Sequence, residues 1–228
     1  MRNFVVTIGF ILARLVLSSP IVFAGNSLFQ VDPEAGNNTF SAVFDAALGE
    51  RIMAVTSNIG CTVTVDESKL TGRAACSVPL TAVRVDNDDT KTEHFQQWAT
   101  NKKTATQQCT FDLDVKDVKL PSTLDEQKPI PFTAEGTFTI CGRKRDDNRP
   151  EKLDGTIIVL PTRSPNSPRT LRIRAHIEHF DRERYGISPK NTEGWLARVQ
   201  QLASVVATEG IIDVNIFATN SPDTRAKK

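Results

Sequence analysis

The sequence predicts an all-β protein made of antiparallel strands, with one short and one longer helix. The first observation behind this prediction is that hydrophobic residues recur at every second position in several stretches between residues 40 and 218. Such alternation is typical of strands that bury one face and expose the other. The second observation is that turn-forming residues separate these stretches, as they do in a β-barrel or a β-sandwich.

Residues 1–24 have the pattern of a secretory signal peptide. Arg2 gives a basic start, residues 4–17 are mostly apolar, and residues 22–24 place small side chains at the spacing of a cleavage site. Arg14 interrupts the apolar stretch, which favours cleavage over a retained membrane anchor. We therefore expect an exported protein, either periplasmic or secreted.

Residues 25–228 are expected to form a single domain. The chain is 39% hydrophobic and 24% charged with a formal net charge of +1, which is the composition of an ordinary globular protein. A chain of about 200 residues buries roughly 70% of its unfolded surface, enough for one core. A near-neutral surface offers no electrostatic attraction for nucleic acid or an anionic bilayer. We expect no nucleic-acid partner, no stable membrane insertion after signal cleavage, and a monomer or homodimer.

Six stretches show the alternation clearly, and three more are weaker strand candidates. The clear stretches are residues 40–44, 61–65, 111–115, 132–140, 171–177 and 212–218. The weaker candidates are residues 52–57, 78–85 and 156–160. Each clear stretch has one apolar and one polar face, as half-buried antiparallel strands require.

The short helix is predicted over residues 91–98. Thr90 and Glu93 have the spacing of a capping box, which favours a helix start at this point. Phe95 and Trp98 lie three residues apart and therefore share one helix face. Core packing is the simpler interpretation of that face, and a binding surface is the alternative.

The longer helix is predicted over residues 195–206, where apolar side chains recur in steps of four, three and four. Two further segments are predicted to lie outside helices and strands. Residues 161–169 contain three prolines and are expected to form a loop, and residues 141–152 carry mixed charge and are expected to form a solvated turn.

The chain has four cysteines, and an even number in an exported protein predicts two disulfides. No pair has C-x-x-C spacing, which argues against a zinc site. A hairpin that pairs Cys61 with Cys76 also pairs Val63 with Ala74 on its apolar face, so this disulfide fits the expected register.

A bridge between the other two cysteines, Cys109 and Cys141, is harder to place. Their midpoint falls inside the connection at residues 121–131, as a hairpin requires. However, Cys109 shares a strand face with Phe111, whereas Cys141 lies on the face opposite Ile140. A β-bulge would be needed to bring the two cysteines together.

The sequence argues against an enzyme, and no catalytic residues, cofactor or metal are predicted. It has no nucleophile elbow, P-loop, dinucleotide fingerprint or H-E-x-x-H motif. His176 and His179 lie three residues apart, which places them on opposite faces of a strand. His94 lies beside Glu93 in the short helix, where it is either a polar group at a cavity mouth or a surface residue.

Apolar side chains of the strands are expected to face one interior. The candidates are Phe40, Phe44, Phe111, Phe138, Ile140, Ile173 and Ile177. A closed sheet of about eight strands encloses room for side chains or for one slender ligand. These residues therefore either line an apolar cavity for a hydrocarbon-tailed molecule or fill a dry core.

Several short motifs resemble, in order, those of one known family. They are FQVDPEAG at residues 29–36, GCTVTVD at 60–66, KTEHF at 91–95 with Trp98, GTFTICG at 136–142, and RERYGI at 182–187. In this order they are similar to the YceI-like family of exported bacterial barrels, which bind polyisoprenoid or related amphiphilic lipids. The resemblance spans roughly residues 29–219.

The resemblance implies a lipocalin-like antiparallel β-barrel of about eight strands that binds a hydrophobic small molecule. Matched by position, His94, Phe95 and Trp98 would cover or line one part of the barrel, and Tyr185 matches the family's aromatic residue before Gly-Ile. The chain departs from the family pattern at Ala35 and Cys141, where the family has histidine.

These observations lead to one main hypothesis and two alternatives. The main hypothesis is an exported, non-enzymatic protein that sequesters or carries a polyisoprenoid or similar amphiphilic lipid in an apolar cavity. The first alternative is a secreted barrel with a filled core that binds a partner protein through enlarged loops. The second is a hydrolase or redox accessory that uses His94 or the histidines near His179.

Overall fold

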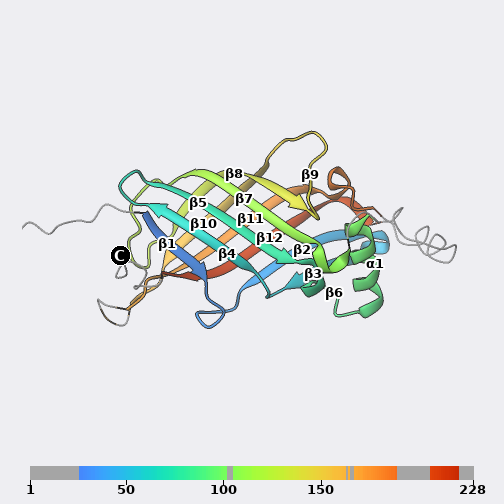
Figure 1. Cartoon of the computed structure of the whole chain (residues 1–228), viewed down its shortest axis with the longest axis horizontal. Helices are drawn as coiled ribbons and strands as arrows, with labels where there is room; N and C mark the ends of the chain where they lie inside the picture. The colour runs from blue at the N-terminus through green and yellow to red at the C-terminus, as the bar shows by residue number, and fades with distance from the viewer. Residues whose placement is uncertain (1–25, 102–104, 163, 165–166, 189–205, 221–228) are drawn as a thin grey trace, which may run out of the picture.

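The computed structural model describes residues 26–101, 105–162, 164, 167–188 and 206–220. Eight antiparallel strands form a closed barrel, because the first strand of the ring pairs with the last (Figure 1). This confirms the predicted fold class. In ring order the strands are β1 (Asn26–Val31), β4 (Gly60–Asp66), β5 (Thr71–Pro79), β7 (Thr110–Lys119), β8 (Ile130–Ile140), β10 (Glu151–Val159), β11 (Thr170–Asp181) and β12 (Val206–Thr219).

Three further strands extend the barrel wall at one end. β2 (Thr39–Ala46) pairs with residues 206–215 of β12, β3 (Arg51–Thr56) pairs with β2, and β6 (Arg84–Val85) pairs with β3. β1 and β2 thus lie one after the other along β12, like one strand with a bend. The buried side chain of Asn38 holds the bend, because its amide donates to the Asp32 carbonyl and accepts from the Phe217 backbone N–H.

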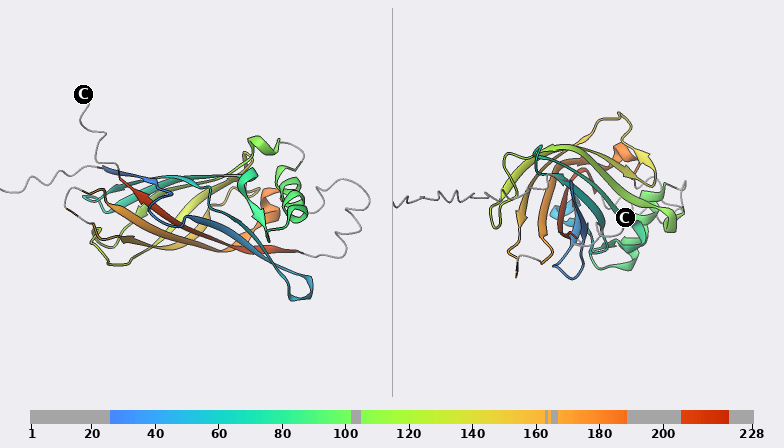
Figure 2. Two further views of the ribbon diagram at one scale, coloured as in Figure 1. Left: turned by 90° about the horizontal axis from the view of Figure 1, so that it is seen from below. Right: turned by 60° about the vertical axis from the view of Figure 1, so that its left-hand side comes forward.

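The helix α1 (Asp89–Thr100) lies at this same end, beside β6 (Figures 1 and 2). Its N-cap is Asp88, whose carboxylate accepts from the Lys91 backbone N–H at 2.9 Å. The predicted helix start at Lys91 was therefore two residues late, because the carboxylate of Asp88 and not Thr90 caps the first turn. The helix also extends two residues beyond the predicted end at Trp98.

Arg143, in the two-residue strand β9 (Arg143–Lys144), fixes the other end of α1. Its guanidinium donates to the carbonyls of Ala99 and Thr100 in the last turn and to the carbonyl of Tyr185. Because the last carbonyls of a helix have no partners within the helix, this one side chain satisfies them and ties α1 to the barrel. None of the helices in the described part of the chain is long and apolar enough to cross a membrane.

Four short 3-10 helices connect the larger elements: η1 (Ala47–Gly49), η2 (Leu80–Ala82), η3 (Thr106–Gln108) and η4 (Arg182–Tyr185). η2 interrupts the strand that was predicted over residues 78–85, so that β5 ends at Pro79 and β6 begins at Arg84. β1 was not predicted from the alternation pattern. Of the predicted helix at residues 195–206, residues 195–205 lie outside the described part of the chain. Its last residue, Val206, is the first residue of β12. The predicted signal peptide also lies outside the described part of the chain.

The Cys61–Cys76 disulfide forms as predicted, within the register of one hairpin. β4 and β5 pair Cys61 with Cys76 and Val63 with Ala74. Because the turn at residues 67–70 sets this register, the two sulfurs meet without a shift in pairing.

Cys109 and Cys141 also form a disulfide, and a local backbone conformation resolves the conflict between their strand faces. β7 and β8 pair Phe111 with Ile140, so a strict register would place residue 142 opposite Cys109. Cys141 instead adopts a left-handed conformation with φ 47°, just after β8 ends. The alternation of side chains stops there, and the sulfur of Cys141 turns toward Cys109.

Removal of the Cys109–Cys141 bridge is expected to lower the free energy of unfolding by about 3 to 4 kcal/mol, because the bridge closes a long loop. The two cysteines are 32 residues apart in sequence. The measurement is urea unfolding of the Cys109→Ala, Cys141→Ala double variant under oxidising conditions. The matching variant of Cys61 and Cys76, which are 15 residues apart, is expected to lose about 3 kcal/mol. A loss below about 1 kcal/mol in the first variant would contradict the prediction.

Candidate functional site

The barrel contains a cavity of about 260 Å³ at the end where α1 lies. Its walls come from β2, β3, the start of β7, the end of β8 and the start of β12, and α1 forms one side. The interior is therefore not completely filled by side chains at this end. Its mouth includes the hairpin tip between β2 and β3, where Leu48 is 100% exposed.

One group of aromatic rings forms the side of the cavity next to α1. The Phe111 ring lies 6.2 Å from the Phe40 ring and 6.0 Å from the Phe95 ring, centroid to centroid, and the Phe95 contact is edge-to-face. Trp98, one helical turn after Phe95, also lines the cavity. Aromatic rings in this geometry give a rigid apolar surface.

A second group of rings forms another part of the wall. The Phe180 ring contacts Phe138 at 5.2 Å, Phe44 at 6.5 Å and Tyr185 at 5.1 Å between centroids. Phe44 packs over Gly210 of β12, where an added Cβ would lie 2.6 Å from Cε1 of Phe44. Only glycine leaves this space, so Gly210 allows the ring of Phe44 to take its position on the cavity wall.

Two alanines keep the space between the aromatic groups open. Ala42 of β2 and Ala54 of β3 are directly opposite each other, and both line the cavity. The same cross-strand row continues to Ile212 of β12 and Val85 of β6. Because the two central members of the row carry only a methyl group, the row leaves room between Phe40 and Phe44 on the same face of β2.

Four polar side chains line the cavity: Glu50, Lys91, His94 and Arg182. Glu50 and Lys91 are exposed, His94 is half-buried, and Arg182 is only 4% exposed. The Lys91 ammonium is 2.8 Å from an Asp86 carboxylate oxygen, which raises the pKa of Lys91. Burial lowers the pKa of Arg182, although a guanidinium stays charged at any physiological pH.

The structure brings most of the predicted site residues to this one cavity. Its lining includes Phe40, Phe44, His94, Phe95, Trp98, Phe111, Phe138 and Ile140. Ile173 and Ile177 are buried in the barrel interior but do not line the cavity. Tyr185 lies behind the wall, with its ring stacked on Phe180.

The lining residues that sequence reasoning missed include Ala42, Ala54, Phe180 and Arg182. The alternation at residues 40–44 already placed Ala42 on the apolar face. However, a small side chain in a sequence does not show whether the space beside it is empty or filled by a neighbour. Phe180 was missed because the β11–β12 register shifts between Ile177 and Phe180. The bulge returns Phe180 to the interior three residues after Ile177, so a strict period of two assigns it to the wrong face.

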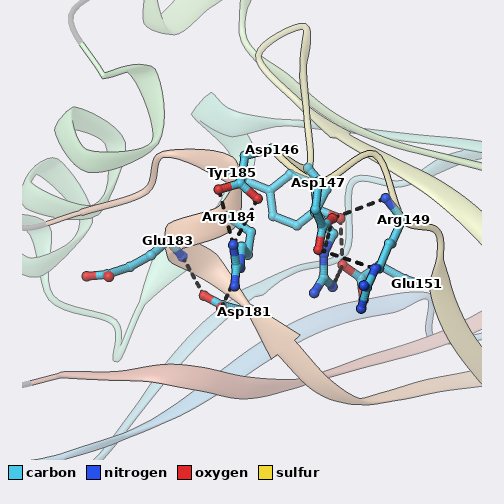
Figure 3. A network of polar contacts seen from close by, with 9 residues as sticks. Asp146, Asp147, Arg149, Glu151, Asp181, Glu183, Arg184 and Tyr185 are labelled. Carbon is cyan, nitrogen blue, oxygen red and sulfur yellow. Dashed lines mark hydrogen bonds and ion pairs between the residues drawn. The ribbon is translucent and has the colours of Figure 1, made fainter.

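A network of polar side chains lies behind the second aromatic group (Figure 3). The Tyr185 hydroxyl donates to Glu151 Oε1 at 2.6 Å, and Arg145 Nη1 donates to the same oxygen at 3.0 Å. Arg145 Nε also donates to Asp147 at 2.8 Å. Glu151 is 3% exposed, and burial together with the Glu151 charge raises the pKa of Tyr185.

This network corrects the interpretation of residues 141–152 as a solvated turn. Arg143 and Lys144 form β9, and Glu151 begins β10 with its side chain buried. The prediction holds for residues 146–150, which are exposed, but it was wrong for Arg145 and Glu151. Mixed charge along a chain does not show which charges will pair in the interior. Here the segment is fixed to η4, which carries Arg182 and Tyr185.

The other two histidines lie away from the cavity. His176 Nδ1 lies 2.7 Å from Asp213 Oδ1 across the β11–β12 pair, and His179 Nδ1 lies 3.7 Å from Glu209 Oε2. Both histidines are more than a third exposed. Among the described residues, no group of three or more His, Cys, Asp or Glu side chains could hold a metal ion.

Comparison with known proteins supports the fold. One similar solved structure is that of a polyisoprenoid binding domain from Saccharophagus degradans implicated in plant cell wall breakdown. The two structures align with a TM-score of 0.57 at 10% sequence identity, over 86% of this chain and 100% of the other. No family model matches the sequence. No curated protein sequence matches it either.

Proposed function

We propose that this protein binds the tail of a polyisoprenoid or similar amphiphilic lipid in the cavity and carries or sequesters it without chemical change. The observation that carries the proposal is an apolar cavity of about 260 Å³ between two groups of aromatic rings. The structural likeness to a polyisoprenoid binding domain supports the same function. Membership of the YceI-like family is part of this proposal.

Burial of apolar area would supply the binding energy. Covering about 200 Å² of a hydrocarbon tail contributes about 5 kcal/mol, and the rigid rings lose little entropy when a ligand packs on them. The volume lies just below the range for pockets that hold small molecules, about 300–1,000 Å³. The cavity therefore suits one segment of a tail.

Export to the periplasm or the cell exterior is the second part of the proposal. The described residues contain two disulfides, and disulfides form and persist mainly in oxidising compartments. The signal-peptide pattern of residues 1–24 supports the same assignment.

Mass spectrometry of an organic extract from natively purified protein tests the function directly. We expect lipid in about equimolar ratio to protein. We also expect the delipidated protein to bind farnesol in a saturable manner, with a dissociation constant on the order of 100 μM. An empty extract together with no saturable farnesol binding would rule out the proposed function. One stoichiometric partner protein in a pull-down from the exported fraction, together with that result, would favour the interaction-module alternative.

A further inference from the structure

Arg182 places a buried positive charge on the wall of the cavity. It is the first residue of η4, and its side chain lines the cavity with only 4% of its surface exposed. Its Nε donates to the Ala207 carbonyl at 3.0 Å, Nη2 to the Val206 carbonyl at 2.8 Å, and Nη1 to the Ile187 carbonyl at 2.7 Å. These carbonyls accept three of the five N–H groups of the guanidinium.

The charge of Arg182 is only weakly balanced by the side chains that the structure describes. Neutral carbonyls accept its hydrogen bonds, and the nearest carboxylate oxygen, on Glu183, lies 3.7 Å away on a side chain that is 46% exposed. The neighbouring Asp181 carboxylate already contacts Arg184 Nε at 3.4 Å. A buried cation is costly unless an anion pairs with it, so a ligand with a negative charge would be favoured at this position.

The other charged groups on the cavity wall, unlike Arg182, are exposed to solvent. Lys91 is exposed and already paired with Asp86 at 2.8 Å. Glu50 is exposed at the mouth, and its charge acts on Lys91. His94 is half-buried on the same face of α1 as Lys91, one turn farther along, and offers a ring nitrogen to a polar head.

We propose that the cavity selects amphiphiles with an anionic head group, a carboxylate or a phosphate, which Arg182 binds while the tail lies between the two groups of aromatic rings. This inference rests on the proposed function and adds the chemical class of the head group. The position of Arg182 fits such an arrangement, because Phe180, two residues before it, belongs to the second aromatic group. A guanidinium can offer two parallel N–H groups to a carboxylate or phosphate.

Three ligands that share one tail and differ only in the head test this proposal: farnesol, farnesoic acid and farnesyl phosphate. We expect the wild-type protein to bind both anions at least about tenfold more tightly than farnesol, by calorimetry at pH 7.5. In Arg182→Gln the preference for the two anions over farnesol should fall below about threefold. Lys116→Gln, which removes one positive charge from the exposed outer face of β7, should keep the full preference.

A second measurement keeps the test decisive if Arg182→Gln does not fold. In wild-type protein labelled with ¹⁵N, the Nε–H resonance of Arg182 is expected to shift on addition of farnesoic acid and to stay in place with an equal amount of farnesol. Equal affinity for all three ligands, a preference that survives in folded Arg182→Gln, or an unmoved Arg182 resonance would overturn the inference. Failure of all three ligands to bind would instead contradict the proposed function itself.

Discussion

The Ala42→Phe variant is expected to bind farnesol at least tenfold more weakly than the wild type, a loss of about 1.4 kcal/mol or more, while it stays folded. Ala42 and Ala54 are the small central pair of the cross-strand row on the cavity wall. A phenylalanine ring at residue 42 would enter the space that we propose for the tail. Because that space is empty of side chains, the ring should not overpack the core.

The control for this variant is Ala75→Phe. Ala75 lies on the exposed face of β5, between Thr62 of β4 and Asp114 of β7 in the cross-strand register. The same substitution there should leave farnesol binding unchanged. If Ala42→Phe binds farnesol as tightly as the wild type and circular dichroism shows a native fold, the cavity is not the binding site.

Replacement of Glu151 by leucine is expected to lower the free energy of unfolding by about 2 to 3 kcal/mol, because two hydrogen bonds to a buried charged acceptor are lost. The Glu151 side chain is 3% exposed and accepts hydrogen bonds from the Tyr185 hydroxyl and from Arg145 (Figure 3). Without the Glu151 carboxylate, the Arg145 guanidinium and the buried Tyr185 hydroxyl lose the acceptor that they share. Urea unfolding at pH 7 with a common slope for both proteins measures the change.

Two matched variants separate the charge pair from simpler effects. Tyr185→Phe removes one donor but leaves Glu151 paired with Arg145, so it should cost only about 1 kcal/mol. Glu135→Leu makes the same substitution at an exposed position of β8 and should change stability by no more than about 0.5 kcal/mol. Equal losses for Glu151→Leu and Glu135→Leu would show that the buried network does not stabilise the fold.

The network also supports the cavity wall from behind. Tyr185 stacks on Phe180, and Phe180 contacts Phe138 and Phe44 on the cavity side. Since Glu151 fixes the Tyr185 hydroxyl, the polar network and the second aromatic group form one connected layer. A loose Tyr185 ring would leave Phe180 without its stacking partner.

The amino-acid sequence by itself determined most of the strands and many of the residues that line the cavity. The alternation at residues 40–44 and 132–140 identified Phe40, Phe44, Phe138 and Ile140 as interior residues, and all four line the cavity. The hairpin register likewise predicted Cys61–Cys76. These predictions succeeded because the period of a strand and the register of a hairpin are local properties of the chain.

Only the tertiary structure decided where the cavity lies and which charges belong to it. The bulge in β11 turns Phe180 inward, the left-handed residue Cys141 allows its disulfide, and Glu151 is buried against Tyr185. Each of these depends on residues far apart in sequence. Closure of the barrel depends on the pairing of β1 with β12, which brings together the two ends of the described chain. A period of two carries no information about such contacts, because every register with the same alternation fits the pattern equally well.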